Sequence, residues 1–259
     1  MKKSVFAIAL GAALSVASIQ ASAVEFLDFK VDEGSIPDAS ANTFVADKIN
    51  GGYNEVLTIN PDLTFATDAF VTFNAFYGNE GADLVPSQIG GIGGAGAPGY
   101  GMYAVFTATG NSTASGFTGT SGLFDLFIDV DQDTTATLPG TAAGSIALAG
   151  NSEDIKLASA TNITYGKGIL GSPGAYRIIW DDFTLTSAGS NYFIEPDPFH
   201  MIIDVNGDFD PNLTSLIPGT FNVTGDTSAA FVVPEPASLA LMGLGLLGLG
   251  AASARRKNA

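Results

Sequence analysis

The fold is constrained most by a succession of short strand-like segments, rich in β-branched and aromatic residues, that Gly, Pro, Asn and Asp separate from one another. Few stretches keep a helical period for three turns, whereas apolar and polar residues often alternate. The expected strands cover residues 24–31, 42–49, 53–60, 63–77, 100–109, 123–130, 177–186 and 199–204. Many short strands with turn residues between them indicate an all-β protein. We therefore expect an antiparallel β-sandwich of jelly-roll or immunoglobulin-like type.

Three segments stand out by their length or composition. Residues 63–77 are long enough for one bent strand or two short ones. Residues 90–101, GGIGGAGAPGYG, carry too few side chains to pack, so we expect a loop there. Residues 134–151 are rich in Thr, Ala and Gly, a composition that predicts a surface loop or a hairpin.

The 259 residues include no cysteine. A disulfide framework, a thiol nucleophile and a thiolate metal site are therefore excluded. The fold must therefore be stabilised by packing of apolar side chains, among them the 18 Phe residues.

The first 23 residues have the composition of a secretory signal peptide. Lys2 and Lys3 precede an apolar run over residues 5–19. The small residues at 21–23, Ala-Ser-Ala, match the pattern that signal peptidase cleaves. We expect cleavage after residue 23, so that residues 24–233 form the secreted domain.

A short extended motif, Pro234-Glu235-Pro236, follows this domain. Each proline ring fixes its own φ and disfavours helix at the preceding residue. A peptide held extended in this way is suited to recognition by a processing enzyme.

An apolar segment and a basic cluster complete the chain. Residues 237–254 carry no charge, and as a helix they would span roughly 27 Å, close to the hydrocarbon thickness of a bilayer. Arg255, Arg256 and Lys257 follow, and basic residues beside an apolar segment stay on the cytoplasmic side. This pattern predicts a transmembrane sorting helix, with an ordinary membrane anchor as the alternative.

The order of Pro-Glu-Pro, apolar segment and basic cluster resembles the PEP-CTERM sorting signal of Gram-negative bacteria. The resemblance implies that an exosortase recognises and cleaves residues 234–259. It also implies that the chain passes through the inner membrane and periplasm and is held in the inner membrane before processing.

Residues 192–210, together with the Gly-rich loop and the tail, resemble the flocculation-associated PEP-CTERM proteins, the PepA-like family of floc-forming bacteria. This resemblance implies an extracellular matrix protein that promotes flocculation and biofilm formation with exopolysaccharide. It implies no catalytic residues.

The secreted domain is strongly acidic. Without the signal peptide and the tail, 5 of the 10 basic residues and 25 of the 26 acidic residues remain, which gives a net charge of −20. Such a surface repels phosphates, so nucleic acid is not expected as a partner. Divalent cations, amine-bearing polymers and uncharged sugars remain as partners.

Enzyme chemistry has little support in the sequence. His200 is the only histidine, and no G-x-S-x-G motif is present to supply a serine nucleophile. Pairs of acidic residues suited to glycoside hydrolysis are too numerous to be informative. We therefore expect a protein that is not an enzyme, with a carbohydrate-binding module or a carbohydrate-active enzyme of the cell envelope as the alternative.

Asp129, Asp131 and Asp133 alternate like the opening of a calcium loop, and carboxylate oxygens are the ligands that Ca²⁺ prefers. The remainder of that loop is missing. Counted from Asp129, position 6 is Thr134 rather than Gly, and position 12 is Gly140 rather than Glu. The run is a candidate Ca²⁺ site.

A second candidate Ca²⁺ site comprises Asp204, Asn206 and Asp208. Gly207 and Pro211 beside it favour a turn stabilised by Asx hydrogen bonds. No other cofactor is expected.

Overall fold

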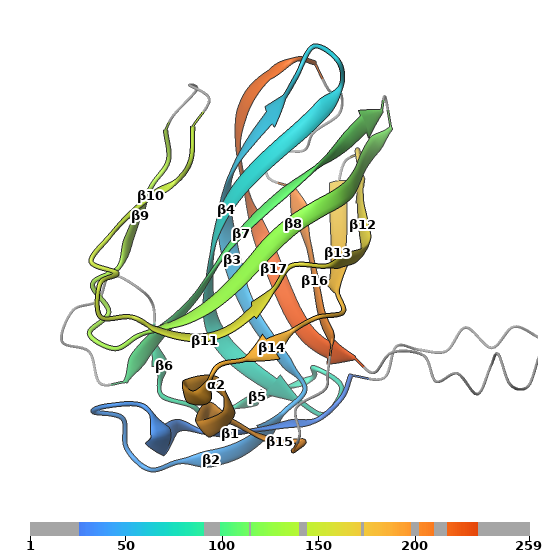
Figure 1. Ribbon diagram of the computed structural model, residues 1–259. Coiled ribbons are helices and arrows are strands. Elements are labelled where there is room, and N and C mark those ends of the chain that lie inside the picture. Colours follow the sequence, from blue (N-terminus) through green and yellow to red (C-terminus); the bar gives the residue numbers. More distant parts are fainter. Residues whose placement is uncertain are drawn as a thin grey trace, which may run out of the picture.

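The computed structural model describes the chain between residues 26 and 232, with gaps (Figure 1). The described residues are 26–90, 99–113, 115–139, 144–171, 174–197, 202–209 and 217–232. They form an all-β protein, so the predicted fold class is confirmed. The predicted signal peptide, residues 1–23, and the predicted sorting signal, residues 234–259, lie outside the described residues.

Eight strands form a closed barrel in which each strand pairs antiparallel with the next one along the chain. They are β3 (Lys48–Ile59), β4 (Thr64–Gly78), β7 (Tyr100–Thr113), β8 (Gly116–Asp129), β12 (Ile163–Ile169), β13 (Gly174–Trp180), β16 (Ile202–Phe209) and β17 (Gly219–Val232). The last strand, β17, returns to pair with β3 along the whole length of β3. The barrel therefore has up-and-down connectivity (Figure 1).

The predicted sandwich is corrected to this barrel. β8 pairs with both β7 and β12, and β17 pairs with β3, so no pair of open edges divides the strands into two sheets. Alternation of apolar and polar residues is the same in a sandwich and in a barrel, since both bury one face of each strand. The sequence pattern therefore could not distinguish them.

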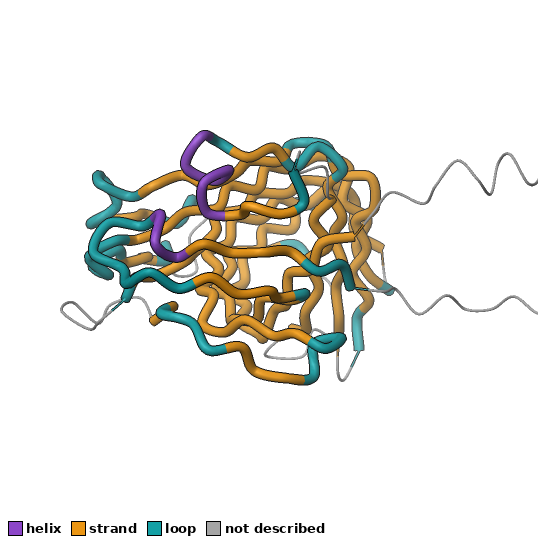
Figure 2. The backbone as a smooth tube through the Cα atoms, turned by 90° about the horizontal axis from the view of Figure 1, so that it is seen from below, coloured by secondary structure: helices purple, strands orange, loops and turns teal. Residues whose placement is uncertain are grey.

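The smaller elements lie at one end of the barrel or beside its wall. They are β1 (Phe29–Asp32), η1 (Glu33–Ser35), β2 (Thr43–Ala46), β5 (Asp83–Val85), β6 (Ile89–Gly90), β9 (Thr135–Thr137), β10 (Ala147–Ala149), β11 (Ile155–Ala160), β14 (Thr184–Leu185), α2 (Ser187–Tyr192) and β15 (Phe193–Glu195). A three-stranded sheet, β15–β1–β2, lies with η1 and α2 at the lower end of the barrel (Figures 1 and 2). β11 continues the barrel sheet beyond β8, and β14 pairs with β11.

Several local predictions are confirmed, and others change. Residues 63–77 form one strand, β4, and residues 134–151 contain the β9–β10 hairpin. The strand expected at 42–49 is divided between β2 and β3. The sequence did not predict β11, β12 and β17, because Gly, Ala, Thr and Ser occupy many of their positions and weaken the apolar alternation.

An aromatic cluster joins the small sheet to the end of the barrel. Phe29 of β1 is 1% exposed, and its ring centroid lies 4.9 Å from that of Phe231 in β17 and 5.8 Å from that of Phe193 in β15. The ring centroid of Phe76 in β4 lies 6.3 Å from that of Phe29. Burial of these rings closes the lower end of the barrel.

A buried carboxylate fixes the same end by hydrogen bonds. Glu33 is fully buried and accepts hydrogen bonds from Asn42 Nδ2, from both nitrogens of Gln88 and from Tyr100 Oη. The Tyr100 hydroxyl in turn lies 2.6 Å from that of Tyr192 at the end of α2. The network connects η1, α2 and β7, which rigidifies the lower end.

Among the described residues, no helix combines the length and apolar character that crossing a membrane requires. The sorting helix predicted over residues 237–254 lies outside these residues.

Replacement of Phe29 by Ala tests the aromatic cluster. Loss of a buried ring leaves a cavity, and we expect the free energy of unfolding to fall by about 3–5 kcal/mol in urea titrations. Leu84→Ala is the control, since Leu84 is 66% exposed and its truncation should cost less than about 0.5 kcal/mol. Equal losses in the two variants would contradict the role assigned to Phe29.

Candidate functional site

Four carboxylates lie together where β8 ends. Asp129 is the last residue of β8, Asp131 and Asp133 follow in the turn, and Glu153 lies in the loop before β11. One oxygen from each side chain lies within 4.8 Å of the others. We call these four residues the acidic cluster. The structure thus brings the three aspartates of the first predicted site together and adds Glu153, which the calcium-loop spacing could not reveal.

Backbone hydrogen bonds and strand pairing build the acidic cluster. Asp129 is fully buried, and its two carboxylate oxygens accept hydrogen bonds from the backbone N–H groups of Asp133 (3.2 Å) and Thr134 (3.1 Å). β11 pairs antiparallel with β8, which brings Glu153 beside this turn. Gly150 has φ +81°, and a Cβ there would lie 2.5 Å from Asp133 Oδ1, so only glycine permits the loop to approach this closely.

The carboxylates of the acidic cluster repel one another. Desolvation and the charges of Asp133 and Glu153 raise the pKa of Asp131, while desolvation and the charges of Glu153 and Asp129 raise the pKa of Asp133. The pKa of Glu153 is lowered, chiefly by a hydrogen bond from Ser152. A bound cation would relieve this repulsion, and oxygen ligands from several carboxylates suit Ca²⁺.

Asp154, the residue after Glu153, fixes the position of the loop that carries the acidic cluster. Its Oδ2 accepts hydrogen bonds from Thr134 Oγ1 (2.8 Å) and from Tyr103 Oη. The Tyr103 ring stacks on Phe127 of β8, with centroids 5.1 Å apart and planes 13° apart. Burial raises the pKa of Asp154, and these contacts hold the loop against the outer barrel wall.

Among the residues whose side chains the structure describes, those of the second predicted site form no comparable cluster. Asp204, Asn206 and Asp208 lie at alternate positions of β16, within the barrel sheet, where the sequence predicted a turn. Asp204 and Asp208 are four residues apart on this extended strand, so about 13 Å separates their Cα atoms. Asp208 Oδ1 instead accepts a hydrogen bond from the backbone N–H of Asp226 in β17.

Calcium should stabilise the fold through the acidic cluster. At free Ca²⁺ ten times its Kd, the free energy of unfolding should rise by about 1.4 kcal/mol, which calorimetry detects as a higher Tm. The double variant Asp131→Asn, Asp133→Asn should lose this response. The exposed Asp38→Asn should keep it. If Ca²⁺ shifts the Tm of all three proteins equally, the acidic cluster is not the binding site.

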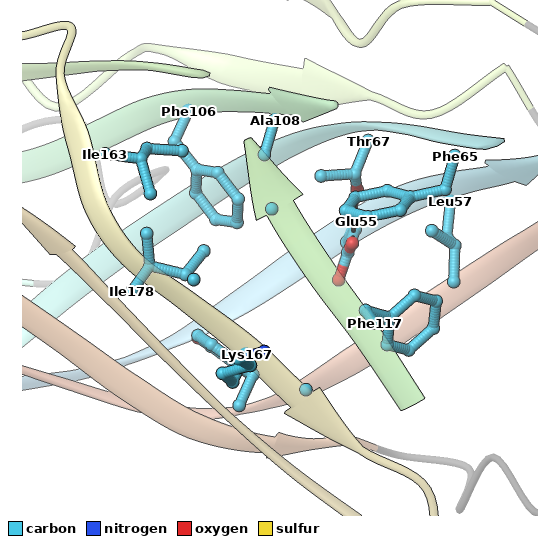
Figure 3. Close-up of a pocket in the computed structure, with 14 residues that line it drawn as sticks. Glu55, Leu57, Phe65, Thr67, Phe106, Ala108, Phe117, Ile163, Lys167 and Ile178 are labelled. Carbon is cyan, nitrogen blue, oxygen red and sulfur yellow. Dashed lines mark hydrogen bonds between the residues drawn. The ribbon is translucent and has the colours of Figure 1, made fainter. Parts of the chain in front are cut away.

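A separate cavity lies inside the barrel (Figure 3). Its volume is about 50 Å³. Fourteen residues of β3, β4, β7, β8, β12 and β13 line it, and most are apolar; the larger apolar ones are Leu57, Phe65, Phe106, Phe117, Ile163 and Ile178. The cavity could not be predicted from the sequence, because its walls come from six strands spread over residues 55–178.

The carboxyl group of Glu55 is enclosed in this interior. Glu55 is 6% exposed and accepts a hydrogen bond from Thr67 Oγ1 on the neighbouring strand β4. Figure 3 shows the two side chains close together, with Phe65 beside them. Burial raises the pKa of Glu55 from 4.5 to about 7, although the hydrogen bond from Thr67 lowers it in part.

The raised pKa makes stability depend on pH. Between pH 4.5 and 7, the folded protein keeps a proton on Glu55 that the unfolded chain has lost. The free energy of unfolding therefore falls as the pH rises through this range, by about 3 kcal/mol in all. Glu55→Gln removes this contribution. We expect the free energy of unfolding of this variant, relative to wild type, to increase across the same pH range.

The exposed Glu80→Gln is the matched control, and this variant should keep the loss of stability that Glu55 causes as the pH rises. Parallel pH–stability curves for wild type and Glu55→Gln would show that Glu55 titrates normally.

Comparison with known proteins identifies one segment of the chain. Residues 232–257 match the PEP-CTERM protein-sorting motif. The match includes Pro234-Glu235-Pro236 and the basic residues 255–257. No curated protein and no solved structure matches the chain. The chain therefore carries a PEP-CTERM protein-sorting motif, which implies recognition by an exosortase, processing at the membrane and a secreted or cell-surface location.

Proposed function

We propose that the protein is a non-enzymatic component of the extracellular matrix that promotes flocculation and biofilm formation together with exopolysaccharide in a Gram-negative bacterium. The sorting motif at residues 232–257 is the observation that carries this proposal, because it directs the domain to the exterior. Signal peptidase and exosortase would remove the two terminal segments.

The charge of the secreted domain supports a role in cation-dependent adhesion. A net charge of −20 keeps copies apart at low ionic strength, since like charges repel over a Debye length of ~30 Å at 0.01 M. Divalent cations bridge carboxylates on neighbouring proteins or on acidic polysaccharide chains. Many weak bridges then act as one multivalent attachment.

The acidic cluster provides a defined place for such a cation. Asp131, Asp133 and Glu153 are exposed and lie beside the buried Asp129. An ion held by these four side chains keeps open coordination positions toward solvent, where a carboxylate of another molecule can bind. The acidic cluster thus supports the proposed bridging.

The alternative is a carbohydrate-binding module or carbohydrate-active enzyme of the envelope. Glycoside hydrolysis requires two carboxyl groups about 5–9.5 Å apart beside the sugar. The barrel cavity is about 50 Å³ in volume, and among the described residues that line it Glu55 carries the one carboxyl group. This geometry favours the matrix role over hydrolysis within the cavity.

A deletion strain tests the matrix role. Cells without the protein should still secrete polysaccharide but grow dispersed, as measured by settling and by polysaccharide assay. Re-expression of wild type should restore flocs, and chelation of divalent cations should disperse them again. Normal flocculation of the deletion strain, or loss of the polysaccharide itself, would refute the proposal.

Two re-expressed variants separate delivery from cation binding. Replacement of Pro234-Glu235-Pro236 by alanines should leave the protein in the membrane fraction and cells dispersed, because the apolar segment and basic cluster remain. Asp131→Asn, Asp133→Asn should be secreted normally but should require more Ca²⁺ for settling. Asp38→Asn is the control for this double change.

A further inference from the structure

The barrel cavity lies where two strands separate. Within the described residues, the pairing of β8 with β12 covers Gly116–Thr118 and Lys167–Ile169. Further along, β8 pairs with β11 instead. Gly119 and Gly166 line the cavity beside this separation and contribute no side chains to fill it. The exposed Lys167 also lines the cavity, which therefore adjoins the protein surface at β12.

Aromatic rings form a large part of the cavity wall. Phe65, Phe106, Phe117 and Tyr176 come from four different strands. The rings of Phe65 and Phe117 meet edge to face, with centroids 5.3 Å apart. Aromatic rings around a small space are the arrangement by which proteins bind ammonium groups, because the ring faces are electron-rich.

The Glu55 carboxylate lines this cavity, and no described basic residue forms an ion pair with it. Thr67 donates to its Oε1, and no other described residue donates a hydrogen bond to the carboxyl group. Neither ion pair found among the described residues includes Glu55. A buried carboxylate is costly unless a cation accompanies it, so the site is complementary to a positively charged molecule.

Lys167, a basic residue that lines the cavity, does not fill this role. Lys167 is exposed, and its Nζ donates to Thr118 Oγ1 at 3.2 Å. Thr118 lies between the inward-facing Phe117 and Gly119 on β8, so its side chain is on the outer face. The Lys167 ammonium group is thus directed to the exterior of the barrel.

We propose that the barrel cavity binds a small organic cation of the alkylammonium class, with the Glu55 carboxylate as its countercharge and the aromatic rings as its walls. A volume of about 50 Å³, where one water needs about 10–15 Å³, limits the bound group to a few heavy atoms. The acidic exterior favours this ligand further, since it raises the local concentration of cations. This proposal is independent of the role in flocculation.

Binding of ethylammonium to the secreted protein, measured by saturation-transfer NMR at pH 8, tests the proposal, with ethanol as a neutral molecule of the same size. We expect ethylammonium to bind in the millimolar range or more tightly, and ethanol to bind about tenfold more weakly or not at all. Absence of saturation transfer to ethylammonium, or equal binding of ethanol, would overturn the proposal.

Two pairs of variants locate the site. Glu55→Gln should weaken ethylammonium binding by about tenfold or more, whereas the exposed Glu80→Gln should not change it. Ala108→Leu, which fills the cavity from β7, should abolish binding, whereas the same change at the exposed Ala66 should not. If Glu55→Gln and Ala108→Leu both bind ethylammonium like wild type, the ligand is held elsewhere and the proposal is wrong.

Discussion

The pairing of β17 with β3 is the interaction on which the rest of the structure depends. It joins Gly219–Ala230 to Lys48–Ile59 and converts a meander of strands into a closed barrel. Closure removes the free backbone groups that sheet edges expose, and in a chain without cysteine it also replaces covalent crosslinks. The interior cavity exists because the strands surround it, whereas the acidic cluster depends on the pairing of β8 with β11.

Inside the barrel, large and small residues are matched across neighbouring strands. Tyr176 packs over Gly207, where a Cβ would lie 2.9 Å from its hydroxyl oxygen, and Tyr53 packs over Gly225. An eight-stranded barrel has an interior that side chains almost fill, so small residues on one strand permit large ones on another. Where glycines of β8 and β12 face the interior without a large partner, the cavity beside Glu55 remains.

The two acidic sites place carboxyl groups in different surroundings. In the acidic cluster, Asp131, Asp133 and Glu153 are exposed carboxylates that lie close together around Asp129 and repel one another. Two backbone N–H groups donate hydrogen bonds to Asp129 and stabilise its charge. Inside the barrel, a single carboxyl group has one hydroxyl partner, and burial raises its pKa. A cation would stabilise either arrangement, but a hydrated divalent ion suits the first and a small organic cation suits the second.

The sequence alone determined what depends on local pattern and composition. Alternation and turn residues indicated the all-β class, and the tail residues Pro234-Glu235-Pro236 indicated exosortase sorting, which the match over residues 232–257 bears out. Only the tertiary structure decided the barrel, the approach of Glu153 to Asp129 and the burial of Glu55. Each depends on pairing between strands distant in the chain, and an alternating pattern does not specify which strands pair.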